Sequence, residues 1–183
     1  PVSVVGPTGE TVFTADDILA GQQVFLKYGL MENRSIWGHG AYVAPDWSAD
    51  WLHREATWFL DHWANENSGK NYSQLDSETQ AMLQARLRKE IRSNTYDAKT
   101  GDLIISAVRA QAIASVGSHY SKLFSDDADL STLRRAYAIP SNSIKTPERR
   151  QLLNAFFFWA SWSCATDRPG QSITYTQNWP PEP

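Results

Sequence analysis

Cysteine is almost absent from this chain of 183 residues, and its scarcity excludes several classes of protein. The single Cys164 cannot form an internal disulfide, and neither C-x-x-C nor C-x-x-C-H occurs anywhere in the sequence. A disulfide framework, a cysteine-based zinc finger and a covalently attached c-type haem are therefore excluded. A chain of this length fits one domain that can bury a core without disulfides or metals.

Long apolar runs and an excess of basic charge are also missing. The formal net charge is -3 and Lys and Arg are scattered, so no basic stripe exists to neutralise phosphates, and nucleic acid is not an expected partner. No run of 18 apolar residues occurs, so no segment is expected to span a bilayer. The opening PVSVVGPTGETVF is neither a translation start nor a signal peptide, which favours a domain excised from a longer protein.

The hydrophobic pattern predicts a mainly helical single domain with one small hairpin. Helix signals begin at a capping box formed by Thr14 and Asp17, and the last helix opens at Thr146 and Pro147. Residues 95–105 carry a turn and a β-branched pair, and they predict a hairpin that would be the only sheet. The helices are expected at 14–29, from Ser48 to about Asn65, from Asp76 to Arg92, at 106–123, at 129–137 and from Thr146 onward, with 30–47 as a loop.

Residues 36–56, IWGHGAYVAPDWSADWLHREA, are unusually rich in Trp and His, and a metal site is one interpretation. His53 and His62 lie nine residues apart, which places them on opposite faces of a helix. Asp50 and His53 share a face, but two ligands do not make a zinc site. A simpler interpretation of Asp50 is a first-turn acid that favours the helix dipole.

Catalytic and sugar-binding interpretations of the same residues are also weak. No G-x-S-x-G motif is present, and Cys164 lies on an apolar helix where a buried thiol is inert. His62 and His119 are expected to fill space or to cap rather than to bind a metal. The tryptophans that could form a sugar-binding platform recur at the spacing of a helix core: Trp51, Trp58 and Trp63.

The last helix is apolar around its whole axis from Phe156 to Trp162, and such a helix must be buried on every side. The run is too short to cross a bilayer, so protein has to cover it. If the domain covers only part of it, the remainder and the 36–47 loop are expected to form an exposed apolar patch near the chain ends.

Two blocks carry a resemblance to a known family: GQQVFLKYGLMENRSIWGHGAYVAPDWSADWLHREA and FFFWASWSCATDRPGQSITYTQNWPPEP. They resemble the extracytoplasmic hydrophilic region of quinol-dependent nitric oxide reductase, a polytopic member of the haem-copper oxidase superfamily. The resemblance covers nearly the whole chain. It implies a parent reaction of 2 NO to N2O and H2O, with two haems and a non-haem iron held by transmembrane helices outside this chain. It implies no catalytic residue here.

The resemblance also implies a location and a history for the domain. Residues 1–183 would form one soluble domain at the periplasmic face of the bacterial inner membrane, packed on the membrane domain of the same chain. In the sister enzymes a separate subunit has a cytochrome c domain followed by a stretch similar to residues 38–45, GHGAYVAP. The chain therefore resembles a cytochrome c-like domain without its haem, because quinol delivers electrons within the membrane. Trp and Phe side chains would fill the space.

A shared calcium ion is the one site that the resemblance assigns to this chain. In the sister enzymes the corresponding loop contributes ligands that map onto the carbonyl of Gly40 and onto Tyr42. Calcium accepts neutral backbone oxygens beside carboxylates, and glycine allows close approach. His39 stands where the sister subunit has an acid, which changes the local charge. The alternatives are a Gly-rich turn that only packs, and a free-standing periplasmic ligand-binding or carbohydrate-binding domain.

Overall fold

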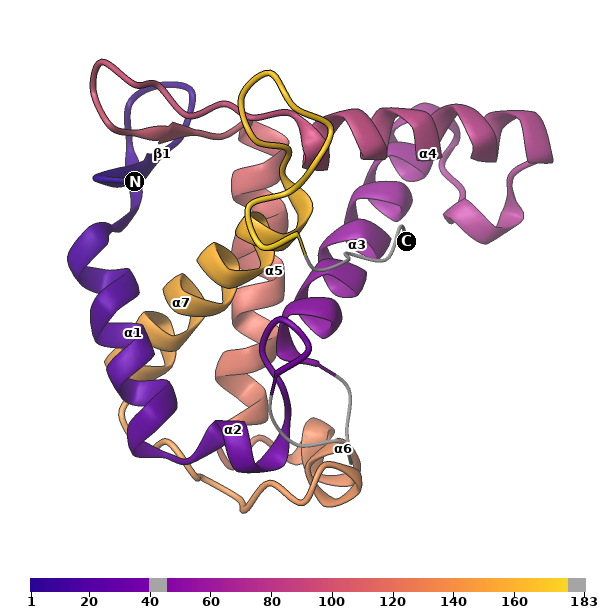
Figure 1. The fold of residues 1–183 in the computed structure, drawn as a ribbon. Helices are drawn as coiled ribbons and strands as arrows, with labels where there is room; N and C mark the ends of the chain where they lie inside the picture. The colour runs from indigo at the N-terminus through magenta and orange to yellow at the C-terminus, as the bar shows by residue number, and fades with distance from the viewer. Residues whose placement is uncertain (40–45, 178–183) are drawn as a thin grey trace.

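Helices dominate the fold, as the hydrophobic pattern predicts (Figure 1). A computed structural model describes residues 1–39 and 46–177. Two short 3-10 turns, Tyr72–Gln74 and Ala128–Leu130, precede α4 and α6. Within the described residues the α-helices are α1 (Ala15–Lys27), α2 (Leu30–Asn33), α3 (Trp47–Ser68), α4 (Ser77–Arg92), α5 (Ala107–Leu123), α6 (Ser131–Ala136) and α7 (Pro147–Ala165).

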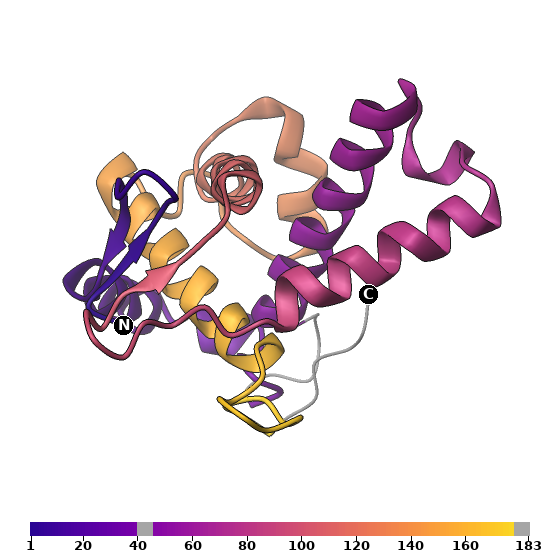
Figure 2. The ribbon, with the colours of Figure 1, turned by 90° about the horizontal axis from the view of Figure 1, so that it is seen from above.

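The long helices form a bundle around α7. Helix α1 lies along α7, while α3 and α5 pack on its other sides and α4 packs beside α3 (Figures 1 and 2). One core cluster joins α1, α5 and α7 to the start of α3, and a second fills the space between α3, α4 and the end of α7. No helix in the described ranges has the length and apolar character needed to cross a bilayer.

Helix α1 forms as its sequence signals predict. Thr14 accepts a hydrogen bond from the Asp17 amide at 3.1 Å, and the Asp17 carboxylate accepts one from the Thr14 amide at 2.8 Å. This reciprocal pair satisfies two of the free amides at the helix start. Gly21 lies on the buried face between Ile18 and Phe25, where the α1 backbone meets α7.

The small sheet differs from the prediction. Strands β1 (Ser3–Val5), β2 (Thr11–Thr14) and β3 (Leu103–Ile104) lie in the order β2-β1-β3. The predicted hairpin at 95–105 provides one antiparallel bridge, between Tyr96 and Leu103, and β3 pairs in parallel with β1. The prediction of a single sheet confined to 95–105 is therefore wrong. Strands β1 and β2 are too short for their alternation to stand out in the sequence.

Two boundaries near the aromatic-rich segment also need correction. Helix α3 begins at Trp47 with Asp46 as its N-cap, and not after Ser48. The Asp46 carboxylate accepts from the amides of Ser48 at 2.8 Å and Ala49 at 3.1 Å, which satisfies the free helix donors directly. The segment predicted as a loop contains the short helix α2, whose first residue, Leu30, is buried in the main core.

Helix α7 starts at Pro147 after Thr146, as predicted, but its apolar surface is covered by the domain itself. Phe156, Phe157 and Phe158 are at most 4% exposed, because α1, α3 and α5 surround them. Trp162 is 6% exposed and lies under Tyr175 at a ring distance of 5.2 Å. The expectation that this run leaves a large exposed patch is wrong. Within it only Trp159 is half-buried.

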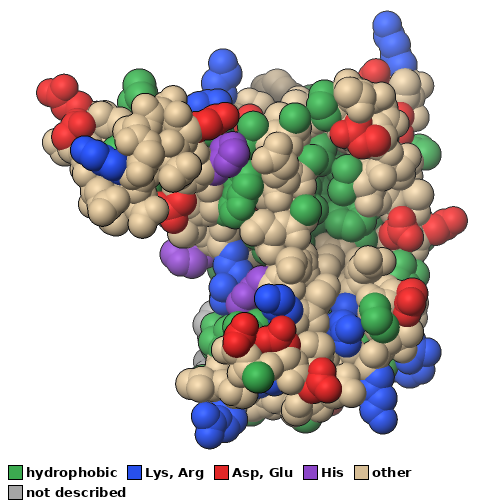
Figure 3. Space-filling view, turned by 180° about the vertical axis from the view of Figure 1, so that it is seen from behind, with side chains coloured by type: hydrophobic (Ala, Val, Ile, Leu, Met, Phe, Trp, Pro, Cys, Tyr) green, Lys and Arg blue, Asp and Glu red, His purple; other side chains and the backbone are tan. Residues whose placement is uncertain are grey.

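The face turned away from the viewer in Figure 1 carries charges of both signs. In Figure 3 acidic and basic side chains are interspersed there, and hydrophobic side chains gather in a strip at the upper right. No large region of one charge stands out on that face, so it offers no extended basic surface to a polyanion.

Candidate functional site: an aromatic pocket beside a tight turn

A tight turn at Ile36–His39 begins the site. The backbone amide and carbonyl of Ile36 pair with those of His39 at 3.0 and 2.9 Å. The two central residues, Trp37 and Gly38, have φ angles of 54° and 75°. Positive φ at both central positions is the geometry of a type I′ turn, which suits Gly38. For a residue as bulky as Trp37 this conformation is strained and needs support from its surroundings.

The Trp37 indole has that support. Its Nε1 donates to the carbonyl of Ala160 at 2.8 Å, and its ring lies 5.5 Å from the ring of Trp159. Both partners belong to α7, more than 120 residues further along the chain. The strained turn therefore directs an indole onto the C-terminal half of the central helix.

Asp46 and Ser35 hold the two flanks of residues 40–45 together. One Asp46 oxygen accepts from the amide of Gly38 at 2.8 Å, while the other caps α3. The amide of Trp47 donates to the carbonyl of Ser35 at 2.9 Å. The described residues on either side of 40–45 thus lie side by side at the N-terminus of α3.

A pocket of about 560 Å³ opens beside this turn. It brings the first residue of the chain together with the turn, with α7 and with the segment that follows α7. We call it the aromatic pocket, because five of its nine residues are Trp or Tyr. Its lining residues are Pro1, Trp37, His39, Tyr96, Trp159, Trp162, Ser163, Tyr175 and Thr176.

The segment after α7 is fixed to the domain by polar contacts. Asn94 donates from Nδ2 to the Tyr175 hydroxyl at 2.8 Å, and Arg168 donates to the Tyr175 carbonyl at 2.7 Å. Thr166 donates to the carbonyl of Ile91 at 3.0 Å, which ties the end of α7 to α4. The buried Nε1 of Trp162 has no hydrogen-bond partner among the described residues. The pocket therefore offers largely aromatic walls, which suit packing against a partner better than acid–base chemistry.

Cys164 does not add a nucleophile to this region. Its thiol is 4% exposed and donates to the carbonyl of Ala160 at 3.3 Å. Burial raises the pKa of the Cys164 thiol to about 12, so the thiolate is scarcely populated at neutral pH. The prediction of a buried thiol on the last helix is confirmed.

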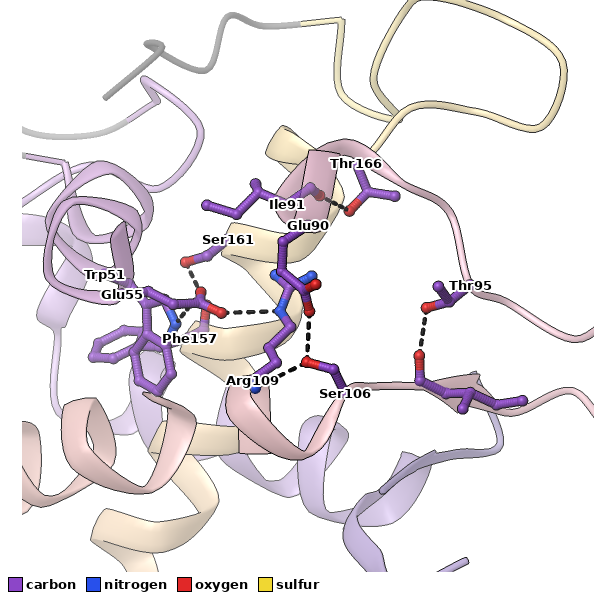
Figure 4. A network of polar contacts seen from close by, with 11 residues as sticks. Trp51, Glu55, Glu90, Ile91, Thr95, Ser106, Arg109, Phe157, Ser161 and Thr166 are labelled. Atoms are coloured by element: carbon purple, nitrogen blue, oxygen red, sulfur yellow. Dashed lines mark hydrogen bonds and ion pairs between the residues drawn. The ribbon is translucent and has the colours of Figure 1, made fainter. Parts of the chain in front are cut away.

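A polar network joins α3 to α5 in the core. Glu55, fully buried, accepts from Arg109 Nε at 2.9 Å and from Trp51 Nε1 at 3.2 Å (Figure 4). Ser106 caps α5 through the Arg109 amide and donates to Glu90 at 2.6 Å. Because Glu55 and Arg109 are far apart in sequence, nothing in the local pattern predicts their pairing.

Asp50 has more partners than a first-turn acid needs. It forms an ion pair with Arg54 at 3.0 Å and accepts from the Tyr120 hydroxyl at 2.5 Å. Burial, together with the Asp50 charge, raises the pKa of the Tyr120 hydroxyl well above its usual range. Burial also lowers the pKa of the adjacent His119 to about 4, with a further contribution from the Arg54 charge. This cluster is therefore structural at neutral pH, with His119 uncharged.

Three histidines border one groove. His53, His62 and His119 all border a groove of about 570 Å³ between α3 and α5. His62 fills space as predicted, stacked on Trp58 with a ring distance of 4.6 Å. Across residues 1–39 and 46–177, no three His, Cys, Asp or Glu side chains are arranged to hold a metal ion.

The calcium ligands that the resemblance implies, Gly40 and Tyr42, lie outside the described residues. Their neighbour His39 lines the aromatic pocket. Three residues of this region were not predicted as site residues: Asp46, Trp37 and Trp159. An Asp two residues before Ser48 is a visible capping signal, whereas the positive φ of Trp37 has no signature in the sequence beyond the glycine that follows it.

Comparison with known proteins bears on the whole chain. A family model for the cytochrome c-like domain of NorB, a subunit of nitric oxide reductase, matches residues 1–181. A comparison with curated protein sequences found no match. The family match covers the first sequence block that carries the resemblance, all but the last two residues of the second block, and every residue that lines the aromatic pocket. The chain therefore belongs to the family of the NorB cytochrome c-like domain of nitric oxide reductase.

Proposed function

We propose that this domain has no catalytic residue of its own and packs against the membrane part of nitric oxide reductase through the aromatic pocket. The observation that carries the proposal is the gathering of five Trp and Tyr side chains, from four separate segments of the chain, around one pocket. Aromatic side chains gathered in this way are typical of the centre of a protein–protein interface. Family membership favours this role over that of a free-standing carbohydrate-binding domain.

We propose further that the domain lies at the periplasmic face and that its interior replaces a haem. The sequence has no C-x-x-C-H, and aromatic rings are stacked through the core. The rings of Trp51 and Tyr120 are 5.5 Å apart at an interplanar angle of 4°, and those of Trp47 and Phe157 are 5.2 Å apart at 19°. In this proposal quinol supplies electrons to the haems and the non-haem iron of the membrane part without a carrier in this domain.

Calcium binding at Gly40 and Tyr42 remains a proposal that depends on the membrane part. This chain would supply only a carbonyl and a phenol, and Ca²⁺ requires about six to eight oxygen ligands. We therefore expect calorimetry of the separately expressed domain to detect no Ca²⁺ binding at micromolar concentrations. The full reductase would bind Ca²⁺, and Tyr42→Phe would weaken that binding. Micromolar binding by the domain alone would show that the site is self-contained and placed elsewhere.

We call the surface around the aromatic pocket the docking face. Its proposed contact with the membrane part can be tested with two matched tryptophan substitutions in the full reductase. Trp159 and Trp58 are both half-buried, but Trp159 lines the aromatic pocket and Trp58 lines the groove between α3 and α5. We expect Trp159→Ser to increase the rate at which a protease releases the domain by roughly tenfold or more, as for the loss of a central interface aromatic. Trp58→Ser should leave this rate near that of the wild type.

The comparison separates docking from folding. If both variants release the domain equally fast, the effect is a loss of domain stability and the docking face is wrong. If neither changes the rate, the aromatic pocket does not contact the membrane part. The haem content of the purified reductase serves as a control, because both substitutions lie outside the proposed haem-binding helices and should leave it unchanged.

A further inference from the structure

Arg34 is the most unusual charged group in the domain. Its side chain is 0% exposed, and its three guanidinium nitrogens have no hydrogen-bond partner in the described part of the chain. The other two buried arginines both have oxygen acceptors. Arg109 donates to the Glu55 carboxylate at 2.9 Å, and Arg134 donates to the carbonyls of Lys122 and Asp127. Of these three, Arg34 alone lacks an oxygen acceptor within residues 1–39 and 46–177.

Two aromatic rings cover the Arg34 guanidinium. Its central carbon lies 4.4 Å from the ring centre of Trp47 and 3.4 Å from that of Tyr137. Such contacts stabilise the positive charge through the ring faces, but they leave the N–H donors in the plane of the guanidinium without acceptors. Burying a cation is costly unless an anion or several oxygen acceptors accompany it. The described residues therefore leave the Arg34 charge without an oxygen acceptor.

The position of Arg34 connects it to the proposed docking face. Arg34 is the C-cap of α2, and its amide donates to the carbonyl of Leu30, the first residue of that helix. The turn that lines the aromatic pocket begins two residues later, and the neighbouring Ser35 carbonyl holds the start of α3. Arg34 therefore lies two residues along the chain from the turn that a docked partner would contact.

We propose that a carboxylate carried by the membrane part pairs with Arg34 when the domain docks. This inference rests on the proposed docking function. A carboxylate matches the planar donor pairs of a guanidinium in a bidentate arrangement. The covering rings have to shift for the pair to form, as interface side chains commonly do on binding. The resulting ion pair is buried, so the loss of one partner has a large effect.

The test compares Arg34→Met with Arg34→Lys in the full reductase, with hydrogen exchange of the Ile36 and His39 amides as the readout. If the membrane part supplies the carboxylate, Arg34→Met leaves that carboxylate unpaired, and exchange should accelerate at least about tenfold. Arg34→Lys keeps the charge without the planar fork and should fall between the wild type and the Met variant. Unchanged or slower exchange in Arg34→Met would overturn the proposal, because removing an unpaired buried cation stabilises the fold.

Two further arms identify the source of the anion. If millimolar sodium acetate slows exchange in the wild type but not in Arg34→Met, a free anion fills the site and the proposal is wrong. If Glu182→Gln, a change outside the described residues, reproduces Arg34→Met, the chain supplies its own carboxylate and the proposal is also wrong. A failure of the docking face is seen separately, since Trp159→Ser tests that face without altering Arg34.

Discussion

Replacing Glu55 by alanine is expected to lower the free energy of unfolding by about 3–5 kcal/mol. Glu55 is 0% exposed and is the only ion-pair partner described for Arg109, which is itself 3% exposed. Without the carboxylate, a buried guanidinium and the Trp51 indole N–H lose their acceptor. One NH2 group of Arg109 already lacks a partner among the described residues, so the remaining structure has little to compensate the charge. Urea unfolding followed by tryptophan fluorescence would measure the change.

A surface pair provides the matched control. Arg92 and Asp167 form an ion pair at 3.0 Å, close to the 2.9 Å of the pair between Glu55 and Arg109. Their side chains, however, are 34% and 28% exposed. Asp167→Ala should cost only about 0–1 kcal/mol, because water replaces the lost partner. Replacing both members of the buried pair, as Glu55→Met with Arg109→Met, should restore most of the stability. An equal loss from Glu55→Ala and Asp167→Ala would show that burial does not set the strength of the Glu55 pair.

The sequence predicts features that depend on a few neighbouring residues, but not contacts between residues that lie far apart in the chain. Signals confined to a few residues were interpreted correctly, such as the Thr14–Asp17 capping box and the start of α7 at Pro147. The pairing of Glu55 with Arg109 joins residues on different helices, and their charges alone would have placed both at the surface. The parallel pairing of β1 with β3 likewise joins strands from opposite halves of the chain.

The candidate site was predictable to a similar degree. The aromatic-rich segment and the last helix were both singled out, and the structure brings Trp37 and Trp159 together. The sequence could not show that the domain would cover Phe156 to Phe158 so completely, because the coverage depends on how closely α1 approaches α7. That approach depends on a single glycine.

Gly21 allows the backbones of α1 and α7 to meet. A Cβ atom at position 21 would lie 2.0 Å from the carbonyl oxygen of Leu152, 2.8 Å from its carbonyl carbon and 2.9 Å from the Cβ of Phe156. Two of these atoms are backbone, so no side-chain rotation can relieve the overlap. The two helices would have to separate, and the packing of Phe25 against Phe156, now at a ring distance of 5.3 Å, would loosen with them.

We therefore expect Gly21→Ala to lower the free energy of unfolding by about 1–3 kcal/mol, and Gly21→Val by more. The gain in helix propensity from Gly to Ala, about 1 kcal/mol, acts in the opposite direction and is too small to offset the overlap. The matched control is Gly117→Ala in α5, where the nearest atom is the side-chain Nδ2 of Asn154 at 3.0 Å. A small shift of that side chain can absorb the methyl group, so the change should stay within about 1 kcal/mol of zero.

Thermal and urea unfolding of both variants would decide whether close helix approach or helix propensity dominates at Gly21. Equal stability changes in the two variants would mean that the α1–α7 contact is less restrictive than the 2.0 Å overlap implies. A shift of α1 caused by a substitution at Gly21 should also reach the docking face, because α1 leads through α2 to Arg34 and the Ile36–His39 turn. In the full reductase, Gly21→Ala should therefore also speed proteolytic release of the domain, whereas Gly117→Ala should not.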